Sequence, residues 1–130
     1  INNKAFLRDV VAEFKYNGVR VSVFIETDAD MIEHAAITGA DRVELYTEAY
    51  AHNYPKGKEN AVKPFADAAL VAKASGLGLN AGHDLSLENL QYFAQEVPGL
   101  LEVSIGHALI SDALYLGLEN TIQMYLRLLS

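Results

Sequence analysis

Four short segments with alternating apolar and polar side chains constrain the fold of this chain most. Their sequences are RVSVFIE, RVELYT, LGLNAGH and LEVSIGH, at residues 20–26, 42–47, 77–83 and 101–107. Alternation with a period of two is typical of β-strands with two different faces. Helical patterns separate the segments, and helical crossovers join parallel strands in right-handed units. We therefore expect an α/β protein with parallel strands in chain order, although alternation alone would also suit an antiparallel sheet with one solvated face.

The helices are predicted from the spacing of apolar residues and from end signals such as capping residues, glycine and proline. They cover residues 6–17, 27–39, 64–75, 86–97 and, from Ser111 on, two segments divided at Gly117. In the second of these helices, Thr27 is the expected cap. The polar stretch 48–63 contains proline and glycine, so we expect a loop there, with at most a turn of helix.

The two sets of alternate strand positions differ in polarity. The apolar set is Val21, Val23, Ile25, Val43, Leu45, Leu77, Leu79, Ala81, Leu101, Val103 and Ile105. The other set is Arg20, Ser22, Arg42, Glu44, Tyr46, Gly78, Asn80, Gly82, Glu102, Ser104 and Gly106. In a (β/α)8 barrel one strand face packs on the helices and the other points into the barrel. We therefore expect a polar concave face, and four β/α units would be half of such a barrel, which needs about 250 residues.

Composition excludes several classes of partner. The net charge is −7 and only 10 residues are Lys or Arg, which argues against a nucleic acid or an anionic membrane as partner. Cysteine is absent, so neither a disulfide framework nor a thiolate metal site is expected. We find no membrane-length apolar run and no leader pattern, and we expect a cytoplasmic protein. The chain begins at Ile1 rather than Met, and we expect a further segment before it.

Two of the strands end in the same dipeptide, Gly-His, at residues 82–83 and 106–107. Histidine gives and takes protons near neutral pH, so His83 is a candidate acid or base. The alternative is that His83 only caps a strand by bonding the backbone. Gly106 and His107 precede a predicted helix, whose first N–H groups can bind an anion. The alternative there is a tight turn and nothing more.

Three longer stretches carry a resemblance to a known family. RVSVFIETDADMIEHAAITGADRVELYTEAYA, GLGLNAGHDLSLENL and LLEVSIGHALISDALYLGLENTI resemble the C-terminal half of the pyridoxine 5′-phosphate synthase family. The resemblance implies a TIM barrel, of which residues 1–130, as a single domain, would supply the last four β/α units. It also implies condensation of 3-amino-2-oxopropyl phosphate with 1-deoxy-D-xylulose 5-phosphate, with release of phosphate and water. No organic cofactor is implied, and the implied assembly is a homo-oligomer, with an octamer as one option.

The resemblance also assigns roles to residues of this chain. It makes His83 the proton donor and Glu44 a residue that stabilises intermediates. Gly106 and His107 would bind the phosphate of the aminoketone. The absent half would supply the other acid/base groups and most contacts to deoxyxylulose phosphate. We therefore do not expect these 130 residues to be active alone.

Three of these assignments leave an alternative open. Asp84 stands where the family has a glycine whose N–H meets the substrate phosphate. We keep Asp84 as a substrate-binding candidate, although its carboxylate would repel phosphate unless it points to solvent. Glu44 could instead form a structural ion pair with Arg20 or Arg42. Asn80 could bind substrate or hold neighbouring strands together.

Other chemistries fit the sequence less well. A zinc site formed by His83, His107 and Glu44 would need these ligands to converge, and no His-x-His pair supports it. None of the lysines ends a strand, which disfavours a Schiff-base aldolase. Two functional classes remain as alternatives. One is another phosphosugar-binding barrel enzyme, an isomerase or decarboxylase. The other is a non-catalytic half-barrel that serves assembly or pairs with a second copy.

Overall fold

A parallel sheet organises the computed structural model, which describes residues 3–130. Its four strands pair in the order β1-β2-β3-β4. They are β1 (Ser22–Ile25), β2 (Arg42–Tyr46), β3 (Gly78–Gly82) and β4 (Leu100–Ser104). Every neighbouring pair is parallel. The expected strand direction and chain-order pairing are confirmed, and the antiparallel alternative is wrong.

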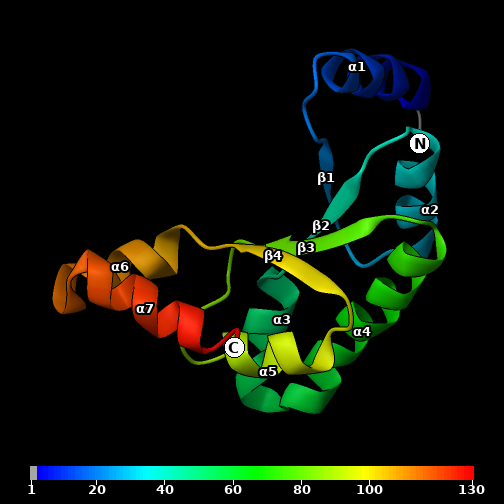
Figure 1. Ribbon diagram of the computed structural model, residues 1–130. Coiled ribbons are helices and arrows are strands. Elements are labelled where there is room, and N and C mark those ends of the chain that lie inside the picture. Colours follow the sequence, from blue (N-terminus) through cyan, green and yellow to red (C-terminus); the bar gives the residue numbers. More distant parts are fainter. Residues whose placement is uncertain (1–2) are drawn as a thin grey trace.

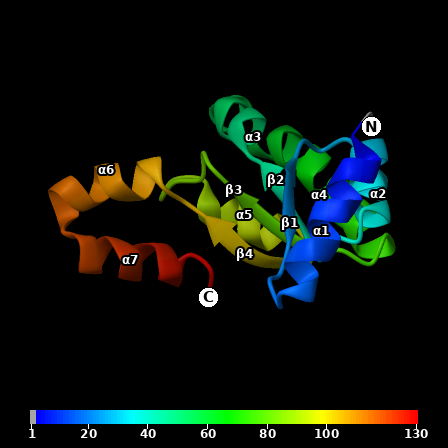
Figure 2. The same ribbon diagram turned by 90° about the horizontal axis from the view of Figure 1, so that it is seen from above.

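The helices cover one face of this sheet and extend beyond both of its ends. They are α1 (Lys4–Tyr16), α2 (Ala29–Ile37), α3 (Glu48–Asn53), α4 (Lys58–Ala74), α5 (Leu90–Glu96), α6 (His107–Leu116) and α7 (Leu118–Arg127), with a short 3-10 helix η1 (Tyr54–Lys56). α2, α4 and α5 pack on the same sheet face, α1 lies at the β1 end, and the α6–α7 pair projects past β4 (Figures 1 and 2). The opposite sheet face carries the polar residues.

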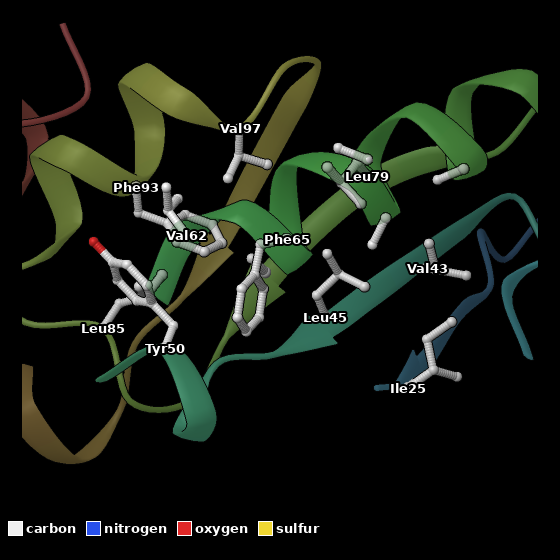
Figure 3. Close-up of a cluster of buried hydrophobic side chains, with 14 of the residues drawn as sticks. Ile25, Val43, Leu45, Tyr50, Val62, Phe65, Leu79, Leu85, Phe93 and Val97 are labelled. Carbon is white, nitrogen blue, oxygen red and sulfur yellow. The ribbon is translucent and has the colours of Figure 1, made fainter. Parts of the chain in front are cut away.

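The core lies between the sheet and its covering helices (Figure 3). Strand residues Val43, Leu45 and Leu79 are buried there together with Phe65 of α4 and Phe93 of α5. The two phenyl rings lie 5.5 Å apart, centroid to centroid, in an edge-to-face arrangement, which aromatic pairs favour. The predicted apolar parity of the strands therefore identifies the helix-facing side of the sheet.

One position of the predicted apolar face is wrong. Between two consecutive residues of β3, the pairing partner in β4 steps from Leu100 to Glu102, so β4 carries one extra residue, as in a β-bulge. Leu100 packs against the core. Leu101 is 61% exposed, and its Cδ1 lies over Gly78, 3.1 Å from where a Cβ would stand. The bulge therefore turns Leu101 to the polar face.

The polar stretch 48–63 is helical, not the loop predicted from its composition. It contains α3, η1 and the first turns of α4. Tyr50, Ala61 and Val62 are buried, and these few apolar contacts anchor the stretch while the polar residues face solvent. Pro64 stands inside α4 rather than at its start. Sparse burial on one helix face is hard to distinguish from a loop by composition alone.

Two predicted helix starts are displaced. Asp28 caps α2 in place of Thr27, since the Asp28 side chain accepts a 2.9 Å hydrogen bond from the N–H of Met31. α6 begins at His107, before the predicted start at Ser111. The earlier start brings the N-terminus of α6 directly to the end of β4.

A turn replaces the first predicted helical residues after β3. Asn89 Oδ1 accepts the N–H of Ser86 at 2.9 Å, and α5 begins only at Leu90. The buried Tyr50 hydroxyl donates to the carbonyl of Asn89 at 2.7 Å. This bond ties the turn to α3 and fixes the chain just beyond the end of β3.

Within residues 3–130, no helix is both long and apolar enough to cross a membrane.

Candidate functional site

An ion-pair network spans the polar face of the sheet. Glu102 Oε2 accepts from an Arg20 guanidinium nitrogen at 3.0 Å and from Arg42 at 2.9 Å. Arg42 also donates to Asn80 Oδ1 at 3.0 Å. The network connects all four strands or their immediate flanks, and it gives Asn80 a structural role. Both arginines considered as partners of Glu44 are thus paired with Glu102 instead.

Glu44 lies beside Gly82, on the neighbouring strand. A Cβ at Gly82 would stand 2.7 Å from Glu44 Oε1 and 2.7 Å from the Ser104 carbonyl oxygen. Such distances are well inside van der Waals contact, so only glycine leaves room for the carboxylate. Among the hydrogen bonds and ion pairs of residues 3–130, none engages the half-buried Glu44 carboxylate. Within these residues, the Glu44 carboxylate therefore does not form the structural ion pair considered as its alternative role.

The backbone turns sharply at His83, directly after β3. Its φ is +94°, and it is the only non-glycine residue with positive φ among residues 3–130. The N–H of His83 donates to the Ser104 carbonyl at 3.0 Å, which continues the pairing with β4 by one residue. Unusual backbone of this kind costs about 1–3 kcal/mol and is found disproportionately at functional sites.

The His83 ring contacts two neighbouring side chains. Its Nδ1 lies 2.8 Å from Asp84 Oδ2, and its plane meets the Tyr46 ring edge-on, with centroids 5.3 Å apart at 81°. The side chain of His83 is 61% exposed. The ring is thus held by a carboxylate, not by the backbone bond considered as the alternative, and its face remains accessible.

Thr47 is a site residue that the sequence analysis missed. It is fully buried directly after β2, and both its N–H and its hydroxyl donate to the carbonyl of Gly82, at 3.1 and 2.7 Å. The same hydroxyl accepts the N–H of Asp84 at 3.1 Å. One buried side chain thus fixes the backbone on both sides of His83. Its position in the sequence could have identified it. Thr47 directly follows β2 as His83 directly follows β3, and the carboxyl ends of adjacent parallel strands lie side by side.

The N-terminus of α6 faces open space at the end of the next strand. Gly106 occupies the cap position without a side-chain capping bond, and the first N–H groups of a helix have no partner within it. A Cβ on Gly106 would meet nothing within 4 Å. His107, the first residue of α6, is exposed. These groups form an arrangement suited to an anion.

Carboxylates dominate the electrostatics around Tyr46. Burial raises the pKa of the Tyr46 phenol, and the nearby charges of Asp84, Glu48 and Glu26 raise it further. The hydroxyl therefore stays protonated at physiological pH and can donate a hydrogen bond.

The predicted site residues gather at the carboxyl ends of three adjacent strands. Glu44 extends from β2 to Gly82, His83 and Asp84 follow β3, and Gly106 and His107 follow β4. Because the three strands are adjacent and parallel, their carboxyl ends lie side by side at the same end of the sheet. No cluster of three or more His, Asp or Glu side chains suited to a metal ion is found in the described part of the chain, residues 3–130.

The sequence is similar to known proteins over nearly its whole length. The family model described as pyridoxal phosphate biosynthesis protein PdxJ matches residues 1–130. A protein of Flavobacterium johnsoniae named pyridoxine 5′-phosphate synthase is 58% identical over 98% of this chain and 54% of its own length. Proteins of the same name from Christiangramia forsetii and Bacteroides fragilis are 60% and 64% identical, over 99% and 95% of this chain and 54% and 52% of their own.

The chain spans about half the length of these curated relatives. The match nevertheless covers every strand and helix described above, including both Gly-His pairs. The resemblance deduced from the sequence is therefore confirmed. This chain belongs to the pyridoxal phosphate biosynthesis protein PdxJ family.

Proposed function

We propose that residues 1–130 form a single domain, the last four β/α units of a (β/α)8 TIM barrel. We further propose that a protein with the full length of its relatives is a pyridoxine 5′-phosphate synthase. The observation that supports both is the convergence of His83, Glu44 and the α6 N-terminus at the carboxyl ends of adjacent parallel strands. TIM-barrel enzymes place their active sites at that end of the barrel.

The proposed reaction condenses 3-amino-2-oxopropyl phosphate with 1-deoxy-D-xylulose 5-phosphate and releases phosphate and water. Ring closure requires proton transfers to oxygen atoms that leave as water. His83 is suited to donate such protons because its ring is accessible at the strand ends and held by its neighbours. Glu44, without a structural cation, would stabilise positive charge that develops on the condensing nitrogen.

The phosphate of the aminoketone would bind at Gly106 and His107. This role is supported by the uncapped start of α6 and by the open space before Gly106. Asp84 remains a predicted substrate-binding residue, although its N–H is engaged by Thr47 and its carboxylate by His83. The family resemblance supports two further parts of the proposal: no organic cofactor, and a homo-oligomer with an octamer as one option. A cytoplasmic location is proposed from the sequence features given above.

Substrate turnover tests the proposed reaction directly. A protein with the relatives' full length is incubated with both ketone phosphates, and pyridoxine 5′-phosphate and inorganic phosphate are measured together. We expect both products in equal amounts. Turnover of a single phosphosugar, without the aminoketone, would identify an isomerase or decarboxylase instead. Absence of any turnover in a folded protein would favour the assembly module.

Replacing His83 by Asn tests its assignment as proton donor. At saturating concentrations of both substrates, kcat should fall by roughly 10²- to 10⁴-fold, as expected for loss of a general acid, with a small change in KM. His52→Asn is the control, since His52 is an exposed histidine of α3 whose ring contacts Lys56 and which has no proposed role in the reaction. Near-normal turnover of the His83 variant would remove His83 from the mechanism.

A further inference from the structure

We propose that Asp84 is a positioning residue that acts through His83. Its carboxylate would keep the proton on Nδ1, so that the imidazolium donates its Nε2 proton to the substrate oxygen that leaves as water and becomes the neutral tautomer protonated on Nδ1. This inference rests on the proposed function, because it assigns to Asp84 a role in the proton transfer proposed for His83.

The geometry of the pair supports this role. Asp84 Oδ2 lies 2.8 Å from His83 Nδ1, a distance typical of a strong hydrogen bond to a charged acceptor. A carboxylate can only accept, so the bond requires a proton on Nδ1. Nε2 is then the nitrogen left for substrate. The Tyr46 ring provides a second contact to the imidazole, in an edge-to-face arrangement.

The backbone of Asp84 is fixed on both sides, which makes the carboxylate a defined acceptor. Its N–H donates to the buried Thr47 hydroxyl at 3.1 Å, and its carbonyl accepts from Asn89 Nδ2 at 3.4 Å. Asn89 in turn is held by Tyr50 of α3. The Asp84 side chain is 32% exposed, so solvent screens it less than a free surface carboxylate.

This arrangement argues against two other roles for the Asp84 side chain. If the Asp84 carboxylate bound the substrate phosphate, two negatively charged groups would be in contact. As a helix cap it would bond the N–H groups at the start of α5, whereas its bond goes to the His83 ring. Carboxylates that orient metal-binding histidines in other proteins fix the tautomer and the ring position, and their loss costs about 10- to 100-fold in metal affinity or activity.

The test compares Asp84→Asn and Asp84→Ala with the parent protein, at the full length of the relatives. An amide can donate to Nδ1 and so favour the opposite tautomer, whereas alanine leaves the ring unrestrained. We expect both variants to lose about 10- to 100-fold in kcat with KM for both substrates nearly unchanged. A lost or relieved phosphate contact would instead change KM.

A spectroscopic measurement separates positioning from a structural role. In protein labelled with 15N-histidine, at a pH where His83 is neutral, we expect a protonated Nδ1 and an unprotonated Nε2. The His83→Asn spectrum assigns the signals. In Asp84→Asn and Asp84→Ala the Nδ1-protonated population should fall. Asp67→Asn is the matched control, since Asp67 is an exposed carboxylate that pairs with Lys63 on α4.

The outcomes distinguish this inference from the proposed function. If His83→Asn is inactive but the Asp84 variants keep normal kcat and the parent tautomer, the inference is wrong and the proposed function stands. If His83→Asn turns over normally, the proposed function of His83 is wrong, and the tautomer measurement still decides whether Asp84 orients the ring. A change in KM alone in the Asp84 variants would make Asp84 a substrate-binding residue and overturn the inference.

Discussion

His83 joins an unfavourable backbone conformation to an accessible imidazole. At φ +94° the backbone of a non-glycine residue is strained, typically by about 1–3 kcal/mol. A glycine at this position would be strained less. The neighbouring Thr47 hydroxyl and Ser104 carbonyl hold the backbone there. The contacts around His83 therefore enforce this conformation at the end of β3.

The two glycines before the histidines should respond differently to the same substitution. In Gly82→Ala the new methyl group would meet Glu44 Oε1 and the Ser104 carbonyl, both at 2.7 Å. We expect this overpacking to lower the free energy of unfolding by about 1–3 kcal/mol. In Gly106→Ala the methyl group meets nothing within 4 Å, so stability should change by no more than about 1 kcal/mol. Urea unfolding measures both.

Each glycine variant serves as the control for the other. If Gly106 borders the phosphate site, Gly106→Ala should raise KM for the aminoketone phosphate while the protein stays fully folded. A stable Gly82→Ala protein would mean that both Glu44 and the Ser104 carbonyl can move away from Gly82. A destabilised Gly106→Ala protein would mean that the start of α6 is packed rather than open.

At the scale of elements, one carboxylate links α1 to the start of β2. Asp41, just before β2, pairs with Lys15 of α1 at 2.8 Å and accepts the N–H of Val21 at 2.9 Å. Lys15 also donates to the carbonyl of Gly39. The hydrogen bond from Lys15 contributes most to lowering the pKa of Asp41 below its usual value of 3.8, followed by the bond from Val21.

The lowered pKa predicts an acid-sensitive attachment of α1. A carboxylate with a depressed folded-state pKa stabilises the fold above its unfolded value and loses this contribution as pH falls through the folded value. Asp41→Asn should therefore destabilise the protein near neutral pH, by no more than about 1 kcal/mol for so exposed a pair. The difference from the parent should vanish well below pH ~4. Urea unfolding at a series of pH values measures this.

Asp67→Asn is the control for this pH series, since Asp67 pairs with Lys63 within α4. It should have a smaller effect at neutral pH, because exposed i,i+4 pairs contribute about 0.3–0.5 kcal/mol. A difference between Asp41→Asn and the parent that persists unchanged at pH ~3 would show that the pair does not hold α1 through charge.

At the scale of the whole molecule, large apolar side chains are exposed at both ends. Phe6 and Phe14 of α1 are 68% and 50% exposed, and Leu114 and Tyr115 of α6 are 82% and 89% exposed. β1 and β4 are the edge strands of the sheet. Apolar patches and open strand edges are normally covered in stable proteins. The proposed barrel would cover them with its other β/α units.

We therefore expect residues 1–130, expressed alone, to self-associate and to bind a hydrophobic dye. Sedimentation velocity over a range of concentrations measures the association, and dye fluorescence measures the apolar surface. A protein with the relatives' full length should bind less dye per residue. A dye-free monomer of residues 1–130 would contradict the barrel proposal, and a discrete dimer would favour the pairing of two half-barrels.

The sequence alone determined which parts of the chain become strands and which strand face is apolar. Period-two alternation and helix end signals are local, so they can be recognised within a few residues. The carboxyl ends of adjacent parallel strands lie side by side, so the predicted strand order also places the two Gly-His pairs at the same end of the sheet. Local patterns also led to errors, because the helical stretch 48–63 is anchored by only a few buried side chains.

Only the tertiary structure decided which side chains meet. The register between strands brings Arg42 to Glu102, leaves Glu44 beside Gly82 and places a bulge at Leu101. The buried Thr47 hydroxyl reaches the backbone around His83 from another strand. These contacts join residues far apart in the chain, and shifting a strand by one residue would exchange its faces. The sequence could therefore predict at which end of the strands the site lies, but not the hydrogen bonds that define the site.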